Sequence, residues 1–77
     1  MTTPKIEILK ANATLLFTDD YTILYSYNTP VACMDVRTKK FYRTDEFFSV
    51  TTSKHINQWL NGRDAEKVDQ SFLYGLS

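Results

Sequence analysis

SVTTSKHINQWLNG, residues 49–62, decides which fold class this chain adopts. Within it, Ile56, Trp59 and Leu60 are spaced i, i+3 and i+4, so they share one face of a helix, and the polar residues between them fall on other faces. We therefore expect one amphipathic helix over about residues 52–61, which buries its apolar face.

Both ends of this helix carry stop signals. Thr51, Thr52 or Ser53 can cap the N-terminus by accepting a hydrogen bond from a free backbone N–H group, and Asn61 with Gly62 permits a left-handed stop at the C-terminus. The same helix start could also bind phosphate, because free backbone N–H groups and the positive end of the helix dipole favour an anion there. Lys54 in the first turn adds a positive charge. We expect the hydroxyls mainly to cap the helix, with phosphate capture as the alternative.

Before the helix, short runs of apolar, β-branched and aromatic residues alternate with turn residues, which is typical of strands. We expect strands at residues 5–9, 14–18, 21–27, 31–36 and 41–44, and a further extended piece at residues 47–51. The loop at residues 37–40 is short, so its flanking strands pair as an antiparallel hairpin. After the helix, Asp69 can cap a last short helix that has Phe72, Leu73 and Leu76 as its apolar contacts.

Runs of strands followed by helices predict an α+β domain. We expect an antiparallel sheet of four to five strands, with the main helix packed on one face and a short C-terminal helix. The 77 residues form a single small domain, residues 1–77, because so short a chain buries only about 60% of its surface on folding. A homodimer that buries a second apolar face is an alternative for so modest a core.

Composition limits the kinds of partner and site, and any binding of nucleic acid would have to be local. Nine Lys and Arg residues balance nine Asp and Glu residues, so no net field attracts nucleic acid or an acidic membrane. Cys33 is the single cysteine, which excludes an intramolecular disulfide, and its apolar strand suggests a small core residue. No apolar run is long enough to cross a bilayer, and the N-terminus lacks a secretion signal. We expect a cytoplasmic protein with no membrane partner.

The sequence offers no recognisable catalytic or metal-binding set. His55 is the single histidine, whereas a general base needs a nucleophile and an orienting group, and zinc needs three or four ligands. The neighbouring carboxylates Asp19 and Asp20 belong to a turn rather than to a converging acid pair. We therefore expect no catalytic residues, no metal and no cofactor, with His55 leaning on Trp59 or a neighbouring strand. A small hydrolase that uses His55 is the weakest alternative.

Two surfaces are candidates for binding. Along residues 21–27 the odd positions share one side of the strand, so a tyrosine-rich face meets either the core or a partner. Together with the exposed helix, this face gives the predicted protein-binding residues Tyr21, Tyr25, Tyr27, Lys54 and Gln58.

The alternative is a nucleic-acid surface on the hairpin at residues 37–43. Cations there would hold the phosphate backbone while aromatic rings stack on bases, and the residues are Arg37, Lys39, Lys40, Phe41, Tyr42 and Arg43. The competing interpretation is that the cations solvate the hairpin tip and discourage edge-to-edge association of sheets.

Three segments resemble known sequences: YNTPVA at residues 27–32, YRT at 42–44 and SVTTSKHINQWL at 49–60. They are similar to a group of short uncharacterised proteins from bacteriophages and prokaryotes that share the pattern Y-x-T-P-V-A … Y-R-T … S-x-T-T-S-K-H-I-N-x-W-L. The likeness covers about residues 24–62 and departs at residues 38–40, where such sequences often have Gly. The resemblance implies a phage-type accessory protein of unknown role. Together with the abundance of tyrosine and the lack of a catalytic set, it favours a non-enzymatic binding module in the host cytoplasm, which binds a host or phage protein and inhibits or redirects a host enzyme.

Overall fold

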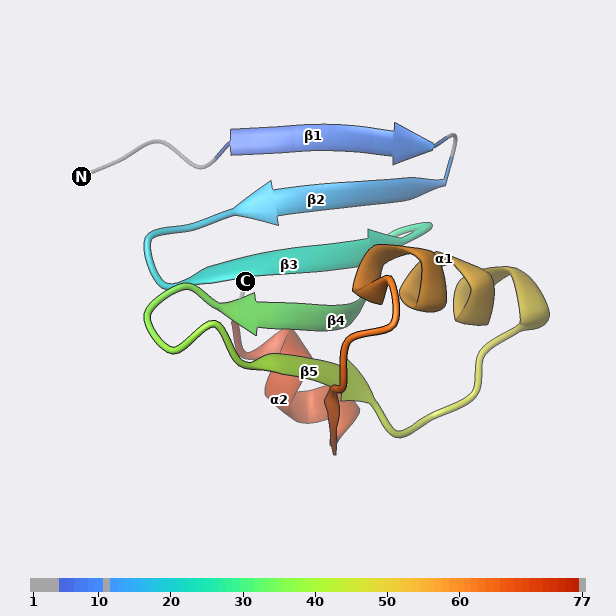
Figure 1. The fold of residues 1–77 in the computed structure, drawn as a ribbon. Coiled ribbons are helices and arrows are strands. Elements are labelled where there is room, and N and C mark those ends of the chain that lie inside the picture. The colour runs from blue at the N-terminus through green and yellow to red at the C-terminus, as the bar shows by residue number, and fades with distance from the viewer. Residues whose placement is uncertain (1–4, 11, 77) are drawn as a thin grey trace.

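The computed structural model describes residues 5–10 and 12–76, which form a six-stranded sheet with one helix on each face (Figure 1). The strands follow one another across the sheet in chain order. Their bounds are Lys5–Lys10 (β1), Ala13–Phe17 (β2), Tyr21–Ser26 (β3), Thr29–Asp35 (β4), Phe41–Thr44 (β5) and Glu66–Val68 (β6). The helices are Val50–Leu60 (α1) and Gln70–Tyr74 (α2).

The first five strands form an antiparallel meander in which each strand pairs with the next. Side-chain hydrogen bonds shape the tight turns in place of glycine. The Asp35 carboxylate, for example, accepts hydrogen bonds from the backbone N–H groups of Arg37 at 2.8 Å and Thr38 at 3.3 Å. An Asx turn of this kind mimics a backbone turn and so closes the hairpin between β4 and β5.

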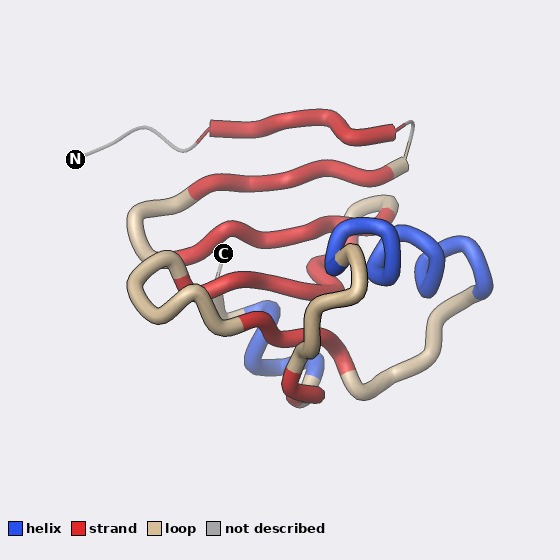
Figure 2. The backbone as a smooth tube through the Cα atoms, in the orientation of Figure 1, coloured by secondary structure: helices blue, strands red, loops and turns tan. Residues whose placement is uncertain are grey.

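The chain then crosses over through α1 and returns beside β5. Residues 61–65 descend across the face of the sheet to β6, which pairs parallel with β5 (Figure 2). A parallel neighbour requires a crossover of this kind, because a tight hairpin can join only antiparallel strands.

The predicted α+β fold is confirmed, including the main helix and the short C-terminal helix. The strand β6 was not predicted, because its three residues are largely polar and exposed. The extended piece at residues 47–51 was wrong: Phe47 and Phe48 lie exposed in a loop, and α1 already begins at Val50.

The predicted N-cap was also wrong, because Ser49 caps α1 in place of Thr51, Thr52 or Ser53. Ser49 has extended backbone angles, and its hydroxyl accepts a hydrogen bond from the Thr52 N–H at 3.1 Å. At the other end, Asn61 adopts the predicted left-handed conformation, with φ of 51°.

The hydrophobic core divides into two clusters, one on each face of the sheet. On the α1 face, Ile56 and Leu60 pack against Leu15, Leu24, Val31 and Ala32. The Trp59 ring packs edge-on against Phe41, with ring centroids 5.3 Å apart. The predicted apolar face of the helix is therefore confirmed.

On the α2 face, Leu73 is fully buried against Ile23 and Cys33. Burial raises the pKa of the Cys33 thiol to about 12, with a smaller contribution from Asp35, so the thiol stays protonated and packs as a core residue. The side chain of Gln70 ties the start of α2 to β4 by donating a hydrogen bond to the Pro30 carbonyl.

Substitution of Ser49 by Ala should lower the free energy of unfolding by about 1 kcal/mol, because the first turn of α1 loses its cap. Thr51→Ala is the matched control, since Thr51 is an exposed hydroxyl in the same turn, and we expect a change within about 0.5 kcal/mol. Urea unfolding followed by far-UV circular dichroism measures both. Equal effects of the two substitutions would show that Ser49 is not the cap.

Candidate functional site

The edge of the sheet at β1 lies away from both helices. Both helices pack over the middle and the β6 side of the sheet, so β1 is left uncovered (Figure 1). In the sheet register, Ile6 pairs with Leu16, and Leu16 pairs with Ile23 of the α2 core. Directly paired residues share a face, so Ile6 and Ile8 project on the α2 side of the sheet. Their side chains are 64% and 74% exposed.

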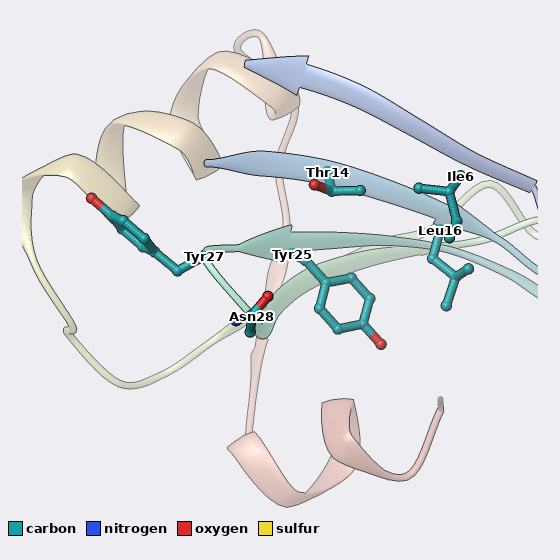
Figure 3. Close-up of a pocket in the computed structure, with 6 residues that line it drawn as sticks. All are labelled: Ile6, Thr14, Leu16, Tyr25, Tyr27 and Asn28. Atoms are coloured by element: carbon teal, nitrogen blue, oxygen red, sulfur yellow. The ribbon is translucent and has the colours of Figure 1, made fainter. Parts of the chain in front are cut away.

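An apolar groove of about 260 Å³ lies beside Ile6 on the same face. It is lined by Ile6, Thr14, Leu16, Tyr25, Tyr27 and Asn28. Leu16 and Tyr25 extend from the sheet toward α2, whereas Tyr27 points away from that helix (Figure 3). We call the groove together with the edge strand β1 the edge groove. An exposed apolar groove beside the open edge of a sheet is a typical place for a protein partner to bind.

Tyr27 occupies the turn between β3 and β4 with a φ of 60°, which is uncommon for an aromatic residue. This conformation aims its side chain across the end of the sheet, and its ring centroid lies 6.3 Å from that of His55 on α1. Tyr27 therefore lies between the edge groove and the start of the helix.

A chain of hydroxyl groups joins that helix start to β3. The Ser26 hydroxyl lies 2.9 Å from His55 Nδ1 and 3.0 Å from Thr52 Oγ1. Ser49 in turn donates to Thr52 Oγ1 at 3.2 Å. Ser26 and Thr52 are only 2% and 4% exposed, so these hydrogen bonds satisfy groups that would otherwise be buried without partners.

A serine bonded to a histidine has the composition of a nucleophile and its base. Here the Ser26 hydroxyl is buried and shared with Thr52, so a substrate cannot reach it. Among the described residues, no carboxylate forms a hydrogen bond or an ion pair with His55. These hydrogen bonds hold α1 against the sheet. His55 contacts a neighbouring strand, β3, as predicted.

The structure divides the predicted protein-binding residues between two faces. Tyr21 and Tyr25 are partly buried on the α2 face, beside Ile23 and Cys33. Tyr25 and Tyr27 meet at the edge groove.

Lys54 and Gln58 are exposed on α1, which covers the opposite face of the sheet. The structure therefore does not bring these two residues together with the tyrosines. Ile6 and Leu16 belong to the groove but were missed, because strand alternation does not show which face a helix leaves open.

The predicted nucleic-acid residues are also dispersed. Arg37 lies 3.7 Å from Asp20, and Lys40 lies 3.2 Å from Glu66. The hydrogen bond to Glu66 raises the pKa of Lys40, and its ammonium lies 5.5 Å from the centre of the Tyr42 ring.

The two rings of that set are partly buried on opposite faces of the sheet, Phe41 beside Trp59 and Tyr42 in the α2 cluster. Lys39 is exposed at the hairpin tip with a φ of 63°. Arg43 lies apart from these cations, in a second cavity at the end of α1.

A cluster of metal ligands and a membrane-spanning helix are both absent from the described part of the chain. No three His, Cys, Asp or Glu side chains among residues 5–10 and 12–76 gather in a way that could hold a metal ion. In the same residues, neither helix has the length and apolar character needed to span a membrane.

The hydrogen-bonded chain from Ser49 to His55 predicts coupled stability effects. Ser26→Ala and Thr52→Val should each lower the free energy of unfolding by about 1–3 kcal/mol, because each leaves buried polar groups with fewer partners. The double variant should cost less than the sum by at least about 0.5 kcal/mol, since the two hydroxyls bond to each other. Chemical denaturation of the four proteins measures the coupling. Strict additivity would mean that the Ser26–Thr52 hydrogen bond contributes nothing.

Comparison with known proteins places the chain in a family. A search of curated proteins and a search of solved structures each found no match. A family model described as a family of unknown function, DUF8033, matches residues 1–75, which is nearly the whole sequence. The chain therefore belongs to the DUF8033 family.

Proposed function

We propose that this chain is a non-enzymatic protein-binding module whose docking surface is the edge groove. The exposure of Ile6 and Ile8 on a terminal strand of the sheet carries the proposal. Native proteins usually protect such strands with charge, proline or a covering segment, because unpaired backbone groups beside apolar side chains attract another strand. Two large exposed isoleucines are consistent with a strand that a partner covers.

The occupant that suits this surface is an extended segment of the partner. Along β1 the outward backbone N–H and C=O groups can pair with an added strand, as in β-augmentation. Side chains of the added strand alternate between faces, so every second one would lie on the α2 side beside Ile6 and Ile8. Apolar residues at those positions would pack against Ile6, which lines the groove.

The resemblance to short phage and prokaryotic proteins supports a host or phage protein as the partner. This binding would take place in the host cytoplasm. Binding would then inhibit or redirect a host enzyme. A second copy of the chain is the competing occupant, because the same edge can pair with itself.

The nucleic-acid alternative at residues 37–43 has weaker support from the structure. Arg37 and Lys40 are paired with carboxylates, and the rings of Phe41 and Tyr42 are partly buried rather than presented for stacking. We therefore place it second.

Ile6→Glu should abolish partner binding, because it puts a charge into the apolar docking surface. The matched control is Val50→Glu, since Val50 is also 64% exposed but lies at the start of α1. Tagged proteins are incubated with host lysate, and bound proteins are quantified by mass spectrometry. We expect the host protein retained by the wild type and by Val50→Glu to be lost at least ~10-fold with Ile6→Glu, a change of about 1.4 kcal/mol or more.

Light scattering of the purified proteins tests the competing occupant. A wild-type dimer that Ile6→Glu converts to a monomer would assign the edge to a second copy. Equal retention of the partner by the Ile6→Glu and Val50→Glu variants would contradict the proposal.

A further inference from the structure

A second cavity lies on the α1 face of the sheet, away from the edge groove. It has a volume of about 450 Å³ and is formed by the end of α1, the connection at residues 61–65 and the strands β5 and β6. Three cationic side chains line it, Arg43, Arg63 and Lys67, against one carboxylate, Asp64. This concentration of positive charge is unlike the balanced composition of the whole chain.

Two of these cations are neighbours in the sheet. Arg43 of β5 pairs with Lys67 of β6, so their side chains leave the same face. Like charges in directly paired positions repel each other and destabilise a sheet. Within the described part of the chain, neither residue forms an ion pair that would offset this repulsion.

Arg43 also carries a donor without an acceptor. Its side chain is partly buried, and Nε is a buried atom with no hydrogen-bond partner. A buried N–H group without an acceptor is costly, and a buried cation without a counter-charge more so. An anion seated in the cavity would supply the negative charge that this cation lacks.

Arg63 is already held in position at the cavity. Its Nη1 donates to the Leu60 carbonyl at 3.3 Å, and its guanidinium carbon lies 5.4 Å from the centre of the Phe41 ring. A guanidinium fixed in this way loses little conformational freedom when it binds a ligand. The amide of Asn57, exposed near the end of α1, adds an uncharged donor to the lining.

We propose that this cavity binds a phosphate dianion, either free phosphate or the phosphomonoester of a small molecule. Three cations and one carboxylate leave a formal charge of +2, which balances the charge of the dianion. Planar guanidinium groups match phosphate oxygens in paired hydrogen bonds. This site lies on the opposite face of the sheet from the edge groove and does not rest on the proposed protein-binding function.

A single phosphate group suits the cavity better than a nucleic-acid strand. A strand needs a track of cations along its backbone. Beyond the cavity, the nearby hairpin cations Arg37 and Lys40 are engaged by Asp20 and Glu66. Among the described residues, Arg43, Arg63 and Lys67 are the cations that line this one cavity together.

The direct test is a titration of the full chain with phosphate, followed by two-dimensional ¹H–¹⁵N NMR. We expect saturable shifts of the backbone N–H signals of Arg43 and residues 61–67, with a dissociation constant on the order of 1 mM at low salt. Arg63→Gln and Lys67→Gln should each weaken binding at least ~10-fold. Arg37→Gln is the matched control outside the cavity and should leave the affinity unchanged.

Titrations with adenosine monophosphate and adenosine distinguish the two sources of phosphate. Tighter binding of the monophosphate than of inorganic phosphate, with no binding of adenosine, assigns a phosphomonoester. Equal affinities for the monophosphate and inorganic phosphate assign the free ion. A single-stranded oligonucleotide that binds more tightly than both, with a salt dependence of several phosphate contacts, would overturn the proposal.

The variant Lys67→Glu separates loss of binding from loss of folding. It places a carboxylate beside Arg43, so the paired positions attract each other and we expect the melting temperature to stay level or rise by about 2–6 °C. The same variant should lose phosphate binding. Retained binding in Lys67→Glu, or no saturable shifts in the folded wild type, would contradict the phosphate site.

Discussion

The burial of Ile56 and Leu60 against the centre of the sheet is the interaction on which the rest of the structure depends. These two side chains meet Leu24, Val31 and Ala32 and fix α1 across β3 and β4. Burying side chains of this size contributes about 1.5–3 kcal/mol each, which is a large share of the 5–15 kcal/mol typical of a folded domain. Because α1 is fixed there, the chain returns beside β5 as β6 and then places α2 on the opposite face.

This arrangement leaves the sheet unequally covered. Both faces of β3 and β4 are buried, whereas β1 stands at an edge with exposed isoleucines. The two candidate surfaces arise from this inequality. The edge groove lies where α2 stops short of β1, and the cationic cavity lies where the end of α1 meets β5 and β6. They differ in chemistry, one apolar and one positively charged, and they occupy opposite faces.

Local patterns predicted the fold, but long-range contacts set the sites. The spacing of Ile56, Trp59 and Leu60 lies within one helix, so the sequence shows it directly. The contact of Ser26 with Thr52 and His55 spans 26 and 29 residues, and no local signal marks it. The strand β6 owes its conformation to pairing with β5 rather than to its own polar residues. Similarly, Arg43 and Lys67 become neighbours only through the parallel register that α1 imposes.

Native-state hydrogen exchange of the free chain tests most directly whether β3 and β4 are the most stable strands of the sheet and β1 is less stable. Amides of β3 and β4 should exchange only through global unfolding, because both faces of these strands are buried. Those of β1 should exchange at least ~100-fold faster through local opening, since one side of this strand is unpaired. Protection of β1 equal to that of β3, in a monomeric sample, would contradict the account.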